Sequence, residues 1–157
     1  MRDIAPCLWF DNEAEEAANF YVSLFPNSRI DHIQRNVTES PSGPKNSVLI
    51  IDFTLKGRPF QALNGGQRIE YTHAISLSSP CADQAEVDRL WNALGDGGTF
   101  IECGWVKDRY GVSWQVFPEI LPKMLADADT ARAARVMRAM MGMVKIDVAG
   151  LEAAYRG

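Results

Sequence analysis

A short motif, glycine–x–x–aromatic–glutamine, occurs twice in the sequence and constrains the fold more than any other feature. The first copy runs from Gly57 to Gln61 and the second from Gly111 to Gln115. Each copy closes a segment with the same predicted order of elements: strand, helix, strand, strand, strand. Repetition of a whole unit fixes an architecture more firmly than any local pattern. The sequence therefore predicts two βαβββ modules built on one plan.

In the first module, apolar runs and the residues between them predict one helix and four strands. The apolar run over 4–10 predicts a buried strand, and we expect Asp11 or Asn12 to cap the helix that follows. Alanine and aromatic residues at helical spacing extend this helix to Phe25, because Pro26 ends it. The remaining strands are expected over 29–38, 47–56 and 59–64.

The second module repeats this order. We expect a strand over 72–79, a loop over 80–82 and a helix that begins at Asp83. Two further strand-like runs follow, near 99–107 and 112–117, separated by a turn.

After Pro118 the sequence becomes rich in alanine and methionine, and its spacing predicts helices only. Its many apolar side chains must pack on the modules or on a partner. We expect one α+β domain over 1–157, composed of module one (1–66), module two (71–118) and a helical tail (119–157).

Charge and cysteine content exclude several classes of protein. The formal net charge is −4 without any basic block, whereas a nucleic-acid surface needs clustered Lys and Arg. No apolar run approaches the roughly 20 residues that span a bilayer, and the first residues contain no apolar signal segment. The three cysteines have neither disulfide-framework nor metal-binding spacing. We therefore expect a cytoplasmic protein with reduced thiols and without nucleic-acid or membrane partners.

Six segments together carry a resemblance to a known family. The most specific is CGWVKDRYGVSWQVFP over 103–118, and the others lie at 6–11, 20–26, 62–66, 86–91 and 135–140. Together they resemble the PhnB-like branch of the glyoxalase/bleomycin-resistance, or vicinal-oxygen-chelate, superfamily, over about 4–155. The resemblance implies sheets that curve around one cavity, within a homodimer. It also implies an inherited name, demethylubiquinone methyltransferase, which we judge unsuited because the glycine pairs lack the G-x-G turn of a doubly wound cofactor fold.

In metal-dependent relatives, the first and last strands of both modules supply four metal ligands. Counting along this sequence places Pro6, Gln61, His73 and Gln115 at those positions. Proline has no ligating side chain and the amides are neutral, so a divalent cation would keep an uncompensated charge. We therefore expect no metal and no other cofactor, while a divalent metal at this site or a displaced one stays as the alternative.

Two functional classes follow from this pattern. The first is a metal-free protein that binds a small organic molecule, and the second is a glyoxalase- or dioxygenase-type enzyme that uses a divalent metal or takes His73 as its base. Phe60 and Trp114 are expected in the core, and Cys7 is expected to face the helix. The ligand pocket is expected to be lined by residues of alternating strand positions: Pro6, Leu8, Gln61, His73, Ile75, Trp105, Gln115 and Phe117, with Phe10 and Leu77 on the same face.

Overall fold

The computed structural model of the chain describes residues 4–157. The chain divides into two compact units, Met1–Glu70 and Tyr71–Gly157. The first unit contains β1 (Cys7–Phe10), α1 (Ala14–Leu24), β2 (Arg29–Arg35), β3 (Val48–Leu55) and β4 (Arg58–Asn64). The second contains β5 (Leu77–Cys81), α2 (Gln84–Gly95), β6 (Thr99–Phe100), β7 (Trp105–Lys107), β8 (Ser113–Pro118), α3 (Ile120–Leu125), α4 (Thr130–Met141) and α5 (Val148–Arg156).

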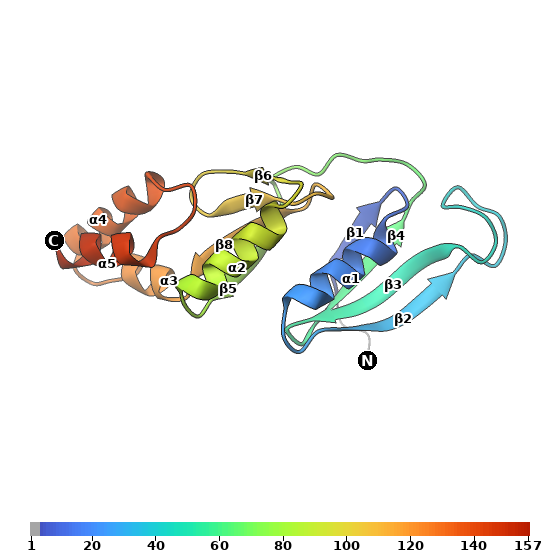
Figure 1. Cartoon of the computed structure of the whole chain (residues 1–157), viewed down its shortest axis with the longest axis horizontal. Coiled ribbons are helices and arrows are strands. Elements are labelled where there is room, and N and C mark those ends of the chain that lie inside the picture. Colours follow the sequence, from blue (N-terminus) through green and yellow to red (C-terminus); the bar gives the residue numbers. More distant parts are fainter. Residues whose placement is uncertain (1–3) are drawn as a thin grey trace. The chain divides into compact units, whose positions relative to one another are not determined.

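Each unit holds one four-stranded sheet with the same topology. The strand orders are β1-β4-β3-β2 and β5-β8-β7-β6, and in both the first and last strands of the module pair in parallel. All other pairs are antiparallel. The predicted α+β fold with two βαβββ modules is therefore confirmed (Figure 1).

The repeated motif forms the turn into the last strand of each module. Gly57 and Gly111 have φ angles of 77° and 90°, a region that glycine enters without steric cost. The aromatic residue of each copy then points away from the glutamine. Trp114 is buried as expected, and the ring of Phe60 packs against that of Phe53 with centroids 5.5 Å apart.

The start of α1 differs from the sequence prediction. Neither Asp11 nor Asn12 is its N-cap, because the helix begins after Glu13, which makes no side-chain cap hydrogen bond. Asn64, which lies at the end of β4 and is distant in sequence, caps the start of the helix instead. Its Oδ1 accepts the N–H of Ala14 at 2.9 Å and its Nδ2 donates to the carbonyl of Val48 at 3.0 Å. One buried amide thus fixes the helix start to two strands.

The first strand of the second module is shorter at its start than predicted and longer at its end. Residues 72–76 form a turn, in which the Thr72 hydroxyl accepts the N–H of Ala74 at 3.3 Å. That N–H is the group a sheet ladder would need. At its other end, β5 continues through Pro80 to Cys81, because β5 is an edge strand and tolerates a residue without an N–H.

The helical tail packs on its own module. Its buried cluster contains Leu121, Met124, Val136, Ile146 and Leu151. Two side chains of α2 hold the segment before α5. Gln84 donates to the Ile146 carbonyl at 3.2 Å and accepts the N–H of Val148 at 2.7 Å, while Asp88 pairs with Lys145 at 2.6 Å.

The homodimer stays a prediction, as does a single cavity enclosed by both sheets. Over residues 4–157, no helix is both long and apolar enough to cross a membrane.

Asp127 joins the ends of the tail. Tyr155 donates its hydroxyl to Asp127 Oδ2, and Arg132 pairs with the same oxygen at 3.4 Å while its guanidinium lies 4.9 Å from the Tyr155 ring centroid. The hydrogen bond from Tyr155, followed by one from the backbone of Asp129, lowers the pKa of Asp127 below its ordinary value. The ionised carboxylate therefore stabilises the fold above that ordinary value of about 4. This stabilisation is lost as pH falls through the lowered pKa.

We predict that Asp127→Asn lowers the thermal unfolding midpoint at pH 7, and that the gap to the unmodified protein closes as pH falls below about 4. Circular dichroism melts between pH 2 and pH 7 measure both curves. Glu152→Gln is the control, because its exposed carboxylate makes only a 3.8 Å pair with Arg156. A gap of equal size at pH 2 and pH 7 would contradict the role given to the ionised carboxylate.

Candidate functional site

The open face of the first sheet carries a row of four side chains that can make polar contacts. The strand register aligns Cys7 with Gln61, Gln61 with Asp52, and Asp52 with His32. Successive residues of a strand point to opposite faces, so aligned residues share a face. The other face is closed by α1, whose buried residues include Ala17 and Tyr21.

A cavity of about 600 Å³ lies on this open face. Its size is typical of sites for small molecules. Its lining residues lie in β2, β3 and β4 and just before β1: Ala5, Asp31, His32, Gln34, Ile50, Asp52, Phe53, Pro59, Phe60 and Gln61. Of the residues predicted from sequence to contact a ligand, Gln61 is the one that lines it.

Asp52 is the central charge of the cavity. It is half-buried, and Gln61 Nε2 donates to its Oδ1 at 2.7 Å. Among the described residues, no lysine, arginine or histidine lies within ion-pairing distance of Asp52, whereas Asp31 pairs with Arg29 at 2.7 Å and accepts a hydrogen bond from Thr54 at 2.6 Å. Asp52 is thus a carboxylate in a cavity with a neutral donor as its hydrogen-bond partner.

Cys7 lies on the open face, which corrects its predicted position against the helix. It aligns with Gln61, and the residue as a whole is exposed. Partial burial of the thiol, together with the negative charge of Asp52, raises the pKa of Cys7 above its ordinary value. The thiol is therefore protonated at neutral pH, which makes it a poor nucleophile.

The same register overturns the predicted positions of Leu8 and Phe10. They align with Ala62 and Asn64, and all four side chains are buried on the helix-covered face. Leu8 and Phe10 therefore contribute to the core and not to the lining of a ligand site. The sequence count was displaced by one residue, which moves every side chain of a strand to the other face.

The register also places other residues than predicted at two of the four ligand positions. Cys7, and not Pro6, stands beside Gln61, and Pro6 contributes its carbonyl to the N–H of Gln61 at 2.9 Å. In the second unit Ser78, and not His73, stands beside Gln115. His73 lies before β5, within the turn described above.

His73 nevertheless lies with Gln115 and Trp105 on the open face of the second sheet. Its Nδ1 lies 2.8 Å from Ser113 Oγ, and its ring meets that of Trp105 edge-on with centroids 6.0 Å apart. Gln115 Nε2 donates to Ser76 Oγ at 2.8 Å. The structure thus brings these three predicted site residues into one polar cluster.

Three other residues expected on the concave side of the second module lie elsewhere. Ile75 is 66% exposed within the turn before β5. Leu77 aligns with the buried Trp114, so it belongs to the helix-covered face. Phe117 packs against the buried cluster of the tail, which covers it. The tail therefore packs on Phe117, one of the apolar side chains that we had expected to line a pocket.

The residues at the strand positions do not fit a divalent metal. They are Cys7 and Gln61 in the first unit and Ser78 and Gln115 in the second. None is a carboxylate or an imidazole, and the Cys7 thiol would have to lose its proton to bind a metal. Over residues 4–157, no three His, Cys, Asp or Glu side chains are placed to hold a metal ion. A dication bound by neutral groups alone would keep its full desolvation cost.

Sequence analysis missed Asp52 and His32. A signal for Asp52 was present, because it is the one charged residue in the apolar run Val48–Leu55. A charge inside a strand that is otherwise apolar marks the face that is not packed on the core. His32 lies in a strand rich in polar residues, where no pattern distinguishes it.

We predict that iodoacetamide alkylates Cys7 at pH 7.5 more slowly than an unperturbed thiol of pKa about 8.5, because less thiolate is present. Asp52→Asn removes the nearby negative charge and should increase this rate. Asp31→Asn is the matched control and should leave the rate unchanged, because Asp31 does not perturb the Cys7 thiol. The rate is measured by mass spectrometry of the Cys7 peptide. A thiol that reacts faster than free cysteine would contradict the account.

Comparison with solved structures supports the fold through the two matches with TM-scores of 0.67 and 0.57. The PhnB protein of Bacillus cereus, described as a 3-demethylubiquinone-9 3-methyltransferase, is 33% identical, and the match covers 74% of this chain and 99% of that chain with a TM-score of 0.67. A Staphylococcus aureus protein is 31% identical, and the match covers 73% of this chain and 96% of that chain with a TM-score of 0.34. Protein PA1353 from Pseudomonas aeruginosa is 23% identical, and the match covers 76% of this chain and 98% of that chain with a TM-score of 0.57. No curated protein matches the sequence.

The family match covers both modules and stops before the tail. The sequence model of the 3-demethylubiquinone-9 3-methyltransferase family matches residues 2–117. The PhnB-like part of the resemblance is thus supported for the modules, while residues 118–157 lie beyond the matched region. The chain belongs to the 3-demethylubiquinone-9 3-methyltransferase family, whose members include the PhnB protein of Bacillus cereus.

Proposed function

We propose that this chain is a glyoxalase/bleomycin-resistance-like protein that binds a small organic molecule on the open face of its first sheet, without a metal. The observation that carries the proposal is Asp52, a half-buried carboxylate on the wall of a cavity of about 600 Å³. Its position in the middle of β3 is set by the sheet and not by a mobile loop. A rigid element gives such a contact a fixed geometry.

The chemistry of the cavity favours a ligand with a positive charge or a strong hydrogen-bond donor. Gln61 supplies Asp52 with one neutral hydrogen bond, which leaves the second carboxylate oxygen available. A carboxylate that is partly removed from water gains most from a charged donor. His32 and Ile50 border the same cavity, so the ligand meets both a polar ring and an apolar side chain.

An enzyme of the glyoxalase or dioxygenase type is the second candidate, and one observation favours it. His73 lies 2.8 Å from the buried Ser113 hydroxyl, so Nδ1 is engaged and Nε2 is the nitrogen left to move a proton. A general base at this place would act on a ligand near Trp105 and Gln115. The metal-dependent form of this candidate is disfavoured by the neutral groups at the strand positions.

The methyltransferase in the family's name has less support. Methyltransferases of the common form use a doubly wound parallel sheet with a glycine-rich turn after the first strand. Each sheet of this chain has a single parallel pair, and β1 is followed by Asp11 and Asn12. We therefore do not assign methyl transfer to the chain.

Benzylamine is a probe for the proposed site, because it joins an ammonium group to an apolar ring. We predict saturable chemical-shift changes at the backbone amides of His32, Asp52 and Gln61 when benzylamine is titrated into ¹⁵N-labelled protein. Asp52→Asn should weaken this binding at least about threefold, as expected for a partly solvated ion pair.

Two controls make this titration specific. Benzoate has the same ring with the opposite charge and should not bind at this face. Glu152→Gln changes a carboxylate outside the cavity and should leave benzylamine binding unchanged. Equal binding of benzoate and benzylamine, or binding that Asp52→Asn does not weaken, would refute the proposed site.

A further inference from the structure

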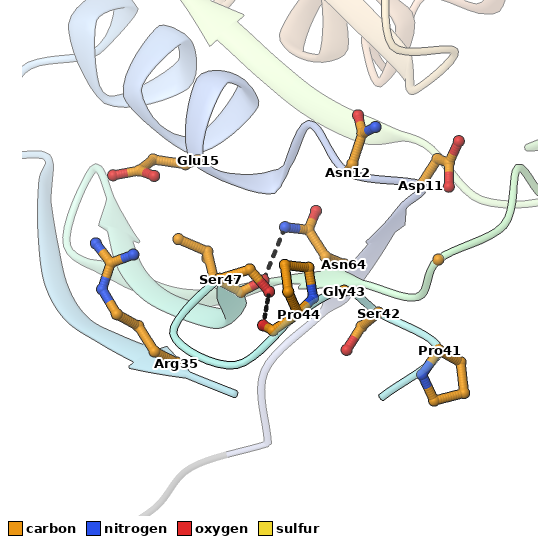
Figure 2. A pocket seen from close by; sticks show the side chains of 12 residues that line it. Asp11, Asn12, Glu15, Arg35, Pro41, Ser42, Gly43, Pro44, Ser47 and Asn64 are labelled. Atoms are coloured by element: carbon orange, nitrogen blue, oxygen red, sulfur yellow. Dashed lines mark hydrogen bonds between the residues drawn. The ribbon is translucent and has the colours of Figure 1, made fainter. Parts of the chain in front are cut away.

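The first unit contains a second cavity of about 600 Å³, and it shares no lining residue with the cavity on the open face (Figure 2). It lies where β1 and β4 end, α1 begins and the chain connects β2 to β3. Its lining residues are mostly polar or charged: Asp11, Asn12, Glu15, Arg35, Pro41, Ser42, Gly43, Pro44, Ser47, Val48, Asn64 and Gly66.

One wall of this cavity is held by Asn64, which is 5% exposed. Its two hydrogen bonds, to the Ala14 N–H and the Val48 carbonyl, fix the first turn of α1 to the start of β3. Glu15 belongs to that first turn, so the Asn64 amide also fixes the backbone from which Glu15 reaches the cavity.

The opposite wall is the β2–β3 connection, and Asn36 holds it. Asn36 is 4% exposed, and its Nδ2 donates to Ser47 Oγ at 2.9 Å. Its Oδ1 accepts from Ser40 at 3.0 Å and from Ser42 at 3.3 Å. The connection is therefore tied together by side chains on the inside and is not a loose loop.

The backbone of the β2–β3 connection lies in close contact with the backbone just after β4. Gly66 has a φ of 72°, and a Cβ at this position would lie 1.7 Å from the Pro41 carbonyl oxygen. Only glycine allows such an approach. The cavity is thus built by three separate parts of the chain that are held in fixed positions.

Three charged side chains face this cavity without neutralising one another. Asp11 follows β1, Glu15 lies on α1 and Arg35 ends β2. Within the described part of the chain, none of the three takes part in an ion pair within 4.0 Å, and the Arg35 side chain donates to the Asn46 carbonyl at 3.1 Å. Figure 2 shows Glu15 and Arg35 reaching the cavity from α1 and from β2.

We propose that this cavity binds a small zwitterion, with an ammonium group held by Glu15 and a carboxylate held by Arg35 (Figure 2). A simple anion would meet two carboxylates, and a simple cation would meet the guanidinium. A ligand that carries both charges meets an opposite charge at Glu15 and at Arg35, and charge-assisted hydrogen bonds of this kind are the strong ones. The size of the cavity fits amino acids and short peptides.

Glycine, L-alanine, diglycine and triglycine test this assignment, because they are zwitterions with increasing separation of the two charges. We expect at least one to produce saturable shifts at the backbone amides of Ser42, Gly43 and Gly66. N-acetylation of that compound removes its ammonium charge, and methyl esterification removes its carboxylate charge. Each derivative should bind about threefold more weakly, because each loses one ionic contact with an exposed side chain.

Glu15 and Arg35 are exposed, so Arg35→Gln and Glu15→Gln should each weaken binding of the zwitterion about threefold, while Arg35→Lys keeps the charge and part of the affinity. Asp52→Asn lies in the other cavity and should have no effect. The ¹⁵N spectrum of each variant confirms its fold before titration. The absence of saturable shifts with all four zwitterions would overturn the proposal. Equal binding of the N-acetylated compound, or binding unaffected by both Arg35→Gln and Glu15→Gln, would overturn it as well.

Discussion

In the first unit, the parallel pairing of β1 with β4 decides which side chains reach the open face of the sheet. Cys7 aligns with Gln61, and from there the row continues to Asp52 and His32. The same pairing sends Leu8 into the core beneath α1. Because a shift by one residue would exchange the two faces, this register is the origin of both the core and the candidate site.

The two cavities of the first unit have different chemistry. On the open face, Asp52 stands beside the neutral Gln61 amide, which favours a ligand of one charge. At the strand ends, carboxylates and a guanidinium stand around the same space, which favours a ligand of both charges. Asn64 lines the second cavity and also accepts the N–H of Ala14, the first residue of α1. The same buried amide therefore stabilises the start of the helix and shapes a binding site.

Much of the fold could be predicted because its signals are local. The repeated turn at Gly57 and Gly111, the cap at Asp83 and the tail helices depend on residues close in sequence. Gln61 and Gln115 were placed on the open faces by strand alternation counted from the repeat, whereas His73 lies before β5 and reaches Ser113 and Trp105 from outside the strand.

The remaining features depend on contacts between distant residues. The face of β1 follows from its pairing with β4, and the role of Asn64 joins positions 50 residues apart. The first strand of the second module was predicted to start at Thr72, whereas the Thr72 hydroxyl accepts a backbone N–H and the strand starts at Leu77. The cavity at the strand ends joins three segments, 11–15, 35–48 and 64–66, and no single segment carries a motif for it.

The first and last strands of these modules present neutral side chains at their paired positions, and we therefore propose that the open face binds its ligand without a metal. Elemental analysis of untagged protein, purified without chelators, tests it most directly. The account predicts less than a stoichiometric amount of any divalent metal per chain. One equivalent of metal per chain that is lost in Gln61→Ala would contradict it.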